Sequence, residues 1–107
     1  GGISENAGLF ANASSIAPLL KMFLQKGSID GIQLLKPKTL ELFTQRTFPQ
    51  SENRRGLGFD KPSIKIDDPY PSELVSPESY GHSGFTGTFI WVDPIDKSFV
   101  VFLSNRV

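Results

Sequence analysis

Apolar residues recur at helical spacing near the start of the chain and predict an amphipathic helix. The recurring positions are Ile16, Leu19, Leu20, Phe23 and Leu24. Because proline is tolerated in the first turn of a helix, Pro18 places the regular start near residue 14 or 15, after a capping turn at residues 12–14. We expect the helix to end at about Lys26, since Gly27 stops it.

A short ribbon and a second helix are expected next. Asp30-Gly31 is a two-residue turn signal between apolar residues, which predicts a ribbon over residues 28–35. Pro37 then opens a helix that runs to about Gln45, with Leu40 and Phe43 facing inward.

Two apolar segments near the C-terminus predict neighbouring strands. Residues 88–92 and 98–103 are β-branched and aromatic, and residues 93–97 link them as a hairpin loop. Both segments are apolar on both faces, which is typical of a sheet covered on both sides. Two helices are a thin cover for such a sheet, so we expect it to be under-covered and the chain to self-associate.

The middle of the chain carries weaker signals. From Phe48 to Glu78 it is rich in Pro, Ser, Asp and Arg, and only residues 56–59 and 64–66 have strand character. The whole pattern predicts an α+β fold with helices packed on an antiparallel sheet. We expect one unit over residues 1–107, made of a helical part at 1–47, an irregular segment at 48–79, and a glycine-rich box with a β-hairpin at 80–107.

Composition excludes several classes of function. The 107 residues suffice for one small domain, and 11 Lys+Arg against 11 Asp+Glu leave no basic excess for nucleic acid or an anionic membrane. No apolar run is long enough for a transmembrane segment. With no cysteine and one histidine, the chain has neither a thiolate zinc site nor a histidine-rich metal site. We therefore expect no metal and no cofactor.

The single histidine lies in the stretch YGHSGFTGTFIWVDP, residues 80–94, which raises the question of a nucleophile. Gly81-His82-Ser83-Gly84-Phe85 is close to the G-x-S-x-G elbow, but that turn needs glycine where Phe85 stands. Side chains of successive strand residues point to opposite faces, so His82 is not a base for its neighbour Ser83. A self-contained Ser-His-Asp site is therefore excluded.

The Ser-x-x-Lys arrangement of serine–lysine hydrolases is also absent. None of the twelve serines has a lysine three positions later. Ser4-Glu5-Asn6 and Ser51-Glu52-Asn53 imitate the Ser-x-Asn box of such enzymes, but both are interpreted as polar loop or cap residues. The remaining candidate for chemistry is the backbone. Gly84 and Gly87 lie at the entrance to a strand, where the lack of side chains lets a ligand approach main-chain N–H groups that polarise a carbonyl.

These residues together resemble a known family. The C-terminal part resembles the end of serine β-lactamase-like domains. The matching features, in order, are His-Ser-Gly, Phe-Thr-Gly-Thr, an apolar strand, an Asp-Pro turn, a second apolar strand and Ser-Asn-Arg. That family comprises class C β-lactamases, penicillin-binding DD-peptidases and related esterases, whose third box is Lys-Thr-Gly or His-x-Gly. Two upstream stretches are similar as well: Ala7-Gly8-Leu9-Phe10, and Lys36-Pro37-x-Thr39-Leu40-x-Leu42-Phe43.

The segment from Arg54 to Pro62, RRGLGFDKP, looks like a narrower branch. In that branch such a domain is fused behind a family 3 glycoside hydrolase acting on β-N-acetylglucosaminides, in cell-envelope proteins. The resemblance thus implies a periplasmic or envelope location.

The resemblance also implies roles for individual residues. His82 would orient a substrate carboxylate or tune the nucleophile, and Ser83 would hydrogen-bond the substrate. The backbone N–H of Phe85 would supply half the oxyanion hole. Gly84 would let the substrate approach, and Gly8 would line the cleft.

The departures imply a partial domain. The family's Ser-x-x-Lys and Tyr-x-Asn boxes would precede this segment and its final helix would follow, so the fold would be a β-lactamase/transpeptidase-like fragment, incomplete at both ends. The fragment would be inactive alone and would complete an acyl-transfer site for an ester, amide or lactam with the rest of the polypeptide. Two alternatives stay open: a non-catalytic accessory domain that binds envelope glycan or peptide beside a β-N-acetylglucosaminidase, and a purely structural domain.

Two further expectations concern large side chains. Trp91 is expected to pack in the core or between layers rather than to bind a ligand. Arg54 and Arg55, adjacent in a polar loop, are expected to be solvated.

Overall fold

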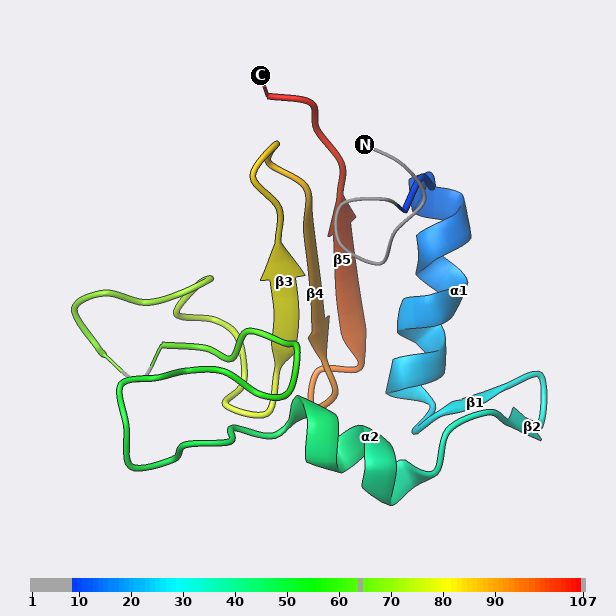
Figure 1. Ribbon diagram of the computed structural model, residues 1–107, viewed down its shortest axis with the longest axis horizontal. Helices are drawn as coiled ribbons and strands as arrows, with labels where there is room; N and C mark the ends of the chain where they lie inside the picture. Colours follow the sequence, from blue (N-terminus) through cyan, green and yellow to red (C-terminus); the bar gives the residue numbers. More distant parts are fainter. Residues whose placement is uncertain (1–8, 64, 107) are drawn as a thin grey trace.

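The structure is a computed structural model that describes residues 9–63 and 65–106. In chain order the elements are α1 (Ala13–Leu24), β1 (Ser28–Ile29), β2 (Ile32–Gln33), α2 (Pro37–Thr44), β3 (Tyr80–Ser83), β4 (Phe89–Asp93) and β5 (Ser98–Phe102). Helices and antiparallel sheets combine in one small unit (Figure 1), and the predicted α+β class is confirmed.

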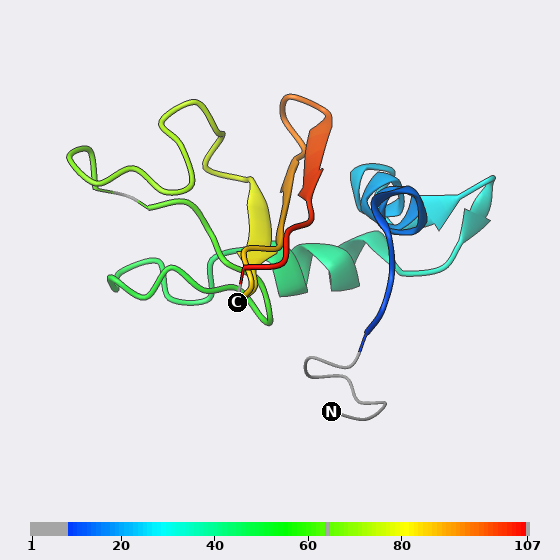
Figure 2. The same ribbon diagram turned by 90° about the horizontal axis from the view of Figure 1, so that it is seen from above.

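The main sheet has the order β3-β4-β5, with both pairs antiparallel. Helix α1 lies along β5 and β4, whereas α2 crosses the end of the sheet near the β4–β5 turn (Figure 1). Seen from above in Figure 2, α1 stands beside β5 and the irregular segment lies beside β3 at the opposite edge. One helix, rather than two, therefore covers a sheet face.

The core lies between α1 and the sheet. Leu20, Tyr80 and Val92 are its most buried members. The rings of Phe23, Phe59 and Tyr80 meet edge to face, with centroids 5.2–6.3 Å apart. These contacts join the helix, the irregular segment and β3 around a single apolar cluster.

The opposite face of the sheet is only partly covered. Trp91 is buried there, stacked on Phe89 and in edge contact with Tyr70 from the irregular segment. Val100 and Phe102 on β5 remain 54% and 59% exposed. The packing interpretation of Trp91 is confirmed, and the surface around Val100 and Phe102 is called the open face below.

The first helix and the ribbon form where the pattern predicts them, but α1 runs from Ala13 to Leu24, so Pro18 lies inside the helix and not in its first turn. The Asn12 side chain caps α1 by accepting from the Ser15 N–H at 2.9 Å. Gly27 follows the helix with φ 92°, and Asp30-Gly31 turns the ribbon with two positive φ angles. In α2, Leu40 is buried, but Phe43 is 45% exposed, so its predicted inward position is wrong.

The irregular segment holds the main correction. Residues 56–59 form no strand: Arg55 and Asp60 pair across them, and the Gly56 N–H donates to the Phe59 carbonyl at 2.9 Å. Residues 65 and 66 are loop, and residue 64 is outside the described residues. Asp60 also pairs with Gly81, so the tight turn at residues 55–60 is attached to β3.

Candidate functional site

The glycine-rich box occupies the end of β3 and the turn into β4. Within the strand, His82 pairs with Ile90 and Ser83 with Phe89. Both box side chains are exposed, and Phe85 at the tip of the turn is 88% exposed. Gly8, a predicted cleft residue, lies outside the described residues.

The turn from residue 84 to residue 87 has a defined backbone geometry. The Gly87 N–H donates to the Gly84 carbonyl at 3.0 Å, and the Gly84 N–H donates to the Thr88 carbonyl at 2.8 Å. Gly87 has φ 91°, whereas Phe85 and Thr86 are not among the residues with positive φ. A type I turn has these features, with Phe85 at its second position.

The C-terminal segment occupies the carbonyl groups of this turn. Arg106 donates from its backbone N–H to the Thr86 carbonyl at 2.9 Å and from its side chain to the Phe85 carbonyl at 3.1 Å. The Ser104 hydroxyl also donates to the Thr86 carbonyl. Within residues 9–63 and 65–106, no group accepts from the Phe85 N–H. The turn therefore presents an exposed donor while its acceptors are engaged by the chain.

At three positions in and beside the box, neighbouring atoms leave no room for a side chain, so glycine is required there. A Cβ atom on Gly81 would overlap the Ile90 carbonyl and the Trp91 ring, so β3 lies tightly on β4 there. At Gly84 and Gly87 the overlap would be with the side-chain oxygens of Thr88 and Ser104. The hydroxyls of Thr88 and Ser104 thus occupy the positions that side chains on Gly84 and Gly87 would take.

His82 is held by groups from two directions. Its Nδ1 lies 2.8 Å from the Ser83 carbonyl oxygen, and its Nε2 lies 3.2 Å from Nη1 of Arg55. Arg55 in turn places Nε 3.1 Å from Oδ1 of Asp60, which is only 4% exposed. The side chains of Asp60, Arg55 and His82 are therefore connected in series.

The expectation that both arginines are solvated holds for Arg55, whose side chain is 51% exposed, but Arg54 is partly buried and both side chains have partners. Arg55 bridges Asp60 and His82, and the Arg54 guanidinium lies 4.1 Å above the Tyr70 ring. Sequence reasoning missed Arg55 and Asp60, because their meeting with His82 depends on the pairing of Asp60 with Gly81. The Gly-Leu-Gly turn between them was the available signal.

Ser83 has no neighbouring base in the described part of the chain. Both ring nitrogens of His82 have other partners, as set out above. Ser51 and Asn53 accept from backbone N–H groups within their own loop, which confirms that this Ser-x-Asn triplet is a polar cap. The described segment therefore offers oriented donors but no activated serine.

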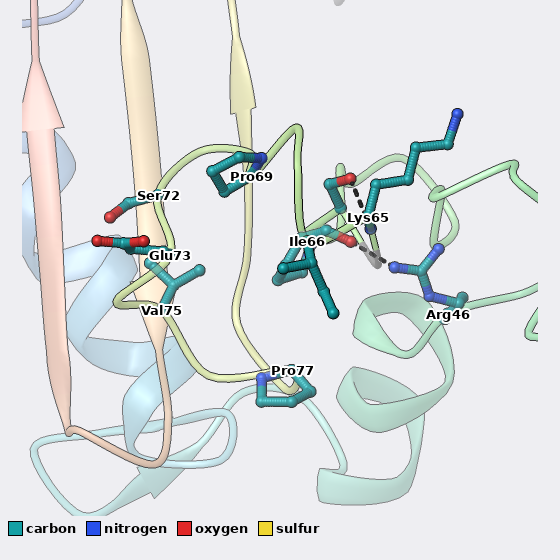
Figure 3. A pocket seen from close by; sticks show the side chains of 10 residues that line it. Arg46, Lys65, Ile66, Pro69, Ser72, Glu73, Val75 and Pro77 are labelled. Carbon is teal, nitrogen blue, oxygen red and sulfur yellow. Dashed lines mark hydrogen bonds between the residues drawn. The ribbon is translucent and has the colours of Figure 1, made fainter.

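Two hollows of the described chain lie away from the box. One, of about 480 Å³, is lined by Arg46 and residues between 62 and 77, with Pro69 and Pro77 among them (Figure 3). The other, of about 1040 Å³, lies between α1, α2 and the β4–β5 turn. Neither of these two hollows is lined by a residue from 81 to 88.

The described residues lack two other kinds of feature, a metal-binding cluster and a membrane-spanning helix. No three His, Asp or Glu side chains gather at metal-binding distances there. No helix in the described ranges is long and apolar enough to cross a membrane.

Comparison with known proteins gives one consistent result. The family model described as Beta-lactamase matches residues 3–107. A protein of Escherichia coli (strain K12) named "Putative D-alanyl-D-alanine carboxypeptidase" is 37% identical over 106 residues. A protein of Salmonella agona (strain SL483) with the same name is 36% identical. Each alignment covers 99% of this chain and 24% of the relative, so the chain spans about a quarter of their length.

Proposed function

Because this chain belongs to the beta-lactamase family, we propose that its β3–β4 turn supplies one wall and half the oxyanion hole of a serine acyl-transfer site. The serine nucleophile belongs to another segment of the full polypeptide. Its Oγ attacks the carbonyl carbon of an ester, amide or lactam and forms an acyl-enzyme. The Phe85 N–H stabilises the negative charge that develops on the carbonyl oxygen.

One observation carries this proposal: Phe85 is 88% exposed, and its N–H has no acceptor within residues 9–63 and 65–106. The neighbouring carbonyls of Phe85 and Thr86 accept from Ser104 and Arg106, so an incoming oxygen meets a donor rather than a competing acceptor. Gly84 precedes this donor without a side chain, and the Thr88 hydroxyl lies where its Cβ would stand.

The remaining roles are proposed from the family resemblance. Ser83, exposed at the end of β3, hydrogen-bonds the substrate, and His82 lines the site beside it. Gly8 lies outside the described residues, and its role in lining the cleft stays a prediction. Residues 1–107 form the C-terminal portion of the complete domain, with the box and hairpin of residues 80–107 as its catalytic wall and no cofactor.

The relatives' names support a cell-wall substrate and an envelope location. They are named for D-alanyl-D-alanine carboxypeptidase activity, which makes a peptide carbonyl of the cell wall the acyl donor we propose. A non-catalytic role beside a β-N-acetylglucosaminidase remains the competing interpretation, drawn from the RRGLGFDKP segment.

Acylation of the full polypeptide by a fluorescent penicillin tests the proposal. We expect the full polypeptide to be labelled and this chain alone, run alongside, not to be. Labelling of the chain alone would show that one of its own serines reacts. A folded full polypeptide that is not labelled would contradict the proposal and favour the accessory-domain interpretation.

A substitution at Gly84 tests the placement of the box in that experiment. A methyl group there would meet only the Thr88 side chain, so the G84A/T88A double variant should fold. We expect its labelling rate to fall on the order of 10-fold or more, because the substrate is displaced from the strand edge. The T88A single variant is the matched control and should be labelled at the normal rate.

A further inference from the structure

We infer that Asp60 and Arg55 are positioning residues that hold His82 as a neutral imidazole with its proton on Nδ1. The inference deepens the proposed function, because it rests on His82 being a site residue. It concerns the ring's protonation state and orientation, which no sequence motif specifies.

Backbone pairing brings the three residues together. Asp60 and Gly81 exchange both N–H to carbonyl hydrogen bonds, at 2.8 and 3.1 Å, one residue before His82. Arg55 pairs with Asp60 across the tight turn, where the Lys61 N–H donates to the Arg54 carbonyl at 2.8 Å. The positions of Arg55 and Asp60 relative to β3 are therefore set by the main chain.

Asp60 orients the guanidinium. Its carboxylate is buried, and a buried carboxylate needs a charged or hydrogen-bonding partner. Arg55 provides it through Nε, while the Tyr70 hydroxyl lies 3.5 Å from the other oxygen. The ion pair keeps Nε beside Asp60, and the planar guanidinium then places Nη1 within hydrogen-bond distance of His82.

The partners of the two ring nitrogens then determine the proton position. A guanidinium can only donate, so Nε2 of His82 must accept and carries no proton. A carbonyl oxygen can only accept, so Nδ1 must carry the proton that it shares with Ser83. An imidazolium would carry a proton on Nε2 and face Arg55 donor to donor, so this arrangement selects the neutral ring.

This assignment specifies what His82 contributes. Its Nε2 lone pair is occupied by Arg55, so the ring is not the base that removes a proton from the attacking serine. The Arg55 guanidinium, which is half exposed, places a positive charge directly beside the His82 ring. His82 acts as a rigid neutral link between that charge and the end of β3.

Nitrogen-15 NMR of the imidazole tests the inference without any variant. The chain has one histidine, so a long-range proton–nitrogen spectrum contains one ring system. At pH 7.5 we expect Nδ1 to be protonated and Nε2 to be unprotonated in the folded chain. A ring that is protonated mainly on Nε2, or that exchanges between both tautomers as in water, would overturn the inference.

Variants separate the positioning role from charge alone. In R55M/D60N both charges are removed together, so no buried carboxylate loses its partner, and we expect the ring to exchange between tautomers. R55K keeps the charge but cannot direct two donors in fixed directions, so it should also fail to hold the tautomer. K65A removes a charge from the Lys65–Glu52 ion pair and is the matched control. An unchanged tautomer in R55M/D60N, with Trp91 fluorescence showing a native fold, would contradict the inference.

Penicillin labelling distinguishes this inference from the proposed function. In a full polypeptide that is acylated, we expect R55M/D60N to lower the labelling rate on the order of 10-fold to 100-fold. A fixed tautomer in a polypeptide that is never acylated would leave the inference standing and remove the proposed function. A normal labelling rate in R55M/D60N would overturn the positioning role while the acyl-transfer site stands.

Discussion

At the scale of single residues, Lys61 is the clearest case of an environment that changes a side chain's chemistry. It is 4% exposed, and its Nζ donates to the Glu78 carbonyl at 2.9 Å and lies 5.7 Å from the centre of the Tyr80 ring. Burial, followed by the charge of Arg46, lowers its pKa from 10.5 to about 8, although Glu78 and Asp93 act in the other direction. Burial raises the pKa of Tyr80 to about 12.

Stability should therefore rise with pH above about 8. Between pH 8 and 10.5 the unfolded chain keeps a proton on Lys61 that the folded chain has lost, so raising the pH favours folding. From pH 7 to pH 10 we expect the free energy of unfolding to gain about 2–3 kcal/mol from this group. The Tyr80 contribution has the opposite sign and lies mainly between pH 10 and 12.

Urea unfolding at pH 7, 8.5 and 10 measures this effect. The K61M variant is the comparison, because it keeps the buried stem and removes the titrating amine. We expect the rise in the free energy of unfolding to be present in the native chain and absent in K61M. Equal pH dependence in the two proteins would show that Lys61 is not the group responsible.

Arg55 shows where prediction from the sequence fails at this scale. The residue type and its polar neighbours indicate a solvated side chain, because nothing local identifies a partner. The partner set depends on Asp60 meeting Gly81, a contact between residues 21 positions apart. Phe85, by contrast, lies between two glycines that mark its turn in the sequence, and the catalytic role of its N–H stays a prediction.

At the scale of elements, Asp93 connects the end of the sheet to the irregular segment. Its carboxylate accepts from the Ser76 N–H at 2.7 Å and from the Ser76 hydroxyl at 2.6 Å, and from the backbone N–H groups of Ile95 and Asp96. Burial alone would raise the pKa of Asp93, but the hydrogen bonds from Ser76, Asp96 and Ile95 outweigh it and lower the pKa. The charged form is therefore stabilised by folding.

Replacing Asp93 should destabilise the fold, because the hydrogen bonds to Ser76 and to the backbone of its own turn are both lost. We expect D93A to lower the free energy of unfolding by about 2–3 kcal/mol at pH 7, as for hydrogen bonds to a charged group. Because the folded pKa is depressed, the native chain should lose this contribution as the pH falls below about 4. Thermal unfolding measures both effects, with D96A in the same turn as the exposed control. A D93A variant as stable as D96A would contradict this role.

Elements with strong periodic patterns were predictable, and those that depend on distant pairing were not. Helix α1 follows from its apolar spacing and from Asn12, and β4 and β5 follow from continuous apolar runs. Strand β3 has the sequence YGHS, whose one large apolar residue gives no strand pattern. It is held as a strand by its pairing with β4 and with Asp60. Residues 56–59 have strand character in sequence, but Gly58 with φ 89° turns the chain back.

At the scale of the whole molecule, the open face is where apolar side chains of the described sheet remain exposed. Val100 and Phe102 are more than half exposed on a three-stranded sheet that α1 covers only on its other side. Exposed apolar sheet faces favour association with another surface. The predicted under-coverage of the sheet thus has a specific location.

We expect the isolated chain to self-associate through this face. Sedimentation velocity should show a weight-average mass that rises with concentration, and V100K/F102E should shift the chain toward monomer. L74K, which places a charge on an exposed loop leucine elsewhere, is the control and should not change the mass. A native chain that is monomeric at every concentration would contradict this expectation.

The central claim is that the Phe85 N–H stabilises the oxyanion, and its removal tests that claim most directly. Phe85 occupies the second position of a type I turn, where proline is favoured, and its N–H has no acceptor within residues 9–63 and 65–106. F85P therefore deletes the donor at little cost to the fold, and F85A keeps the donor while removing the ring. In the full polypeptide we expect F85P to lower the rate of acylation by fluorescent penicillin about 10²–10³-fold relative to F85A. Equal rates in the two variants would show that this backbone donor does not act on the reacting carbonyl.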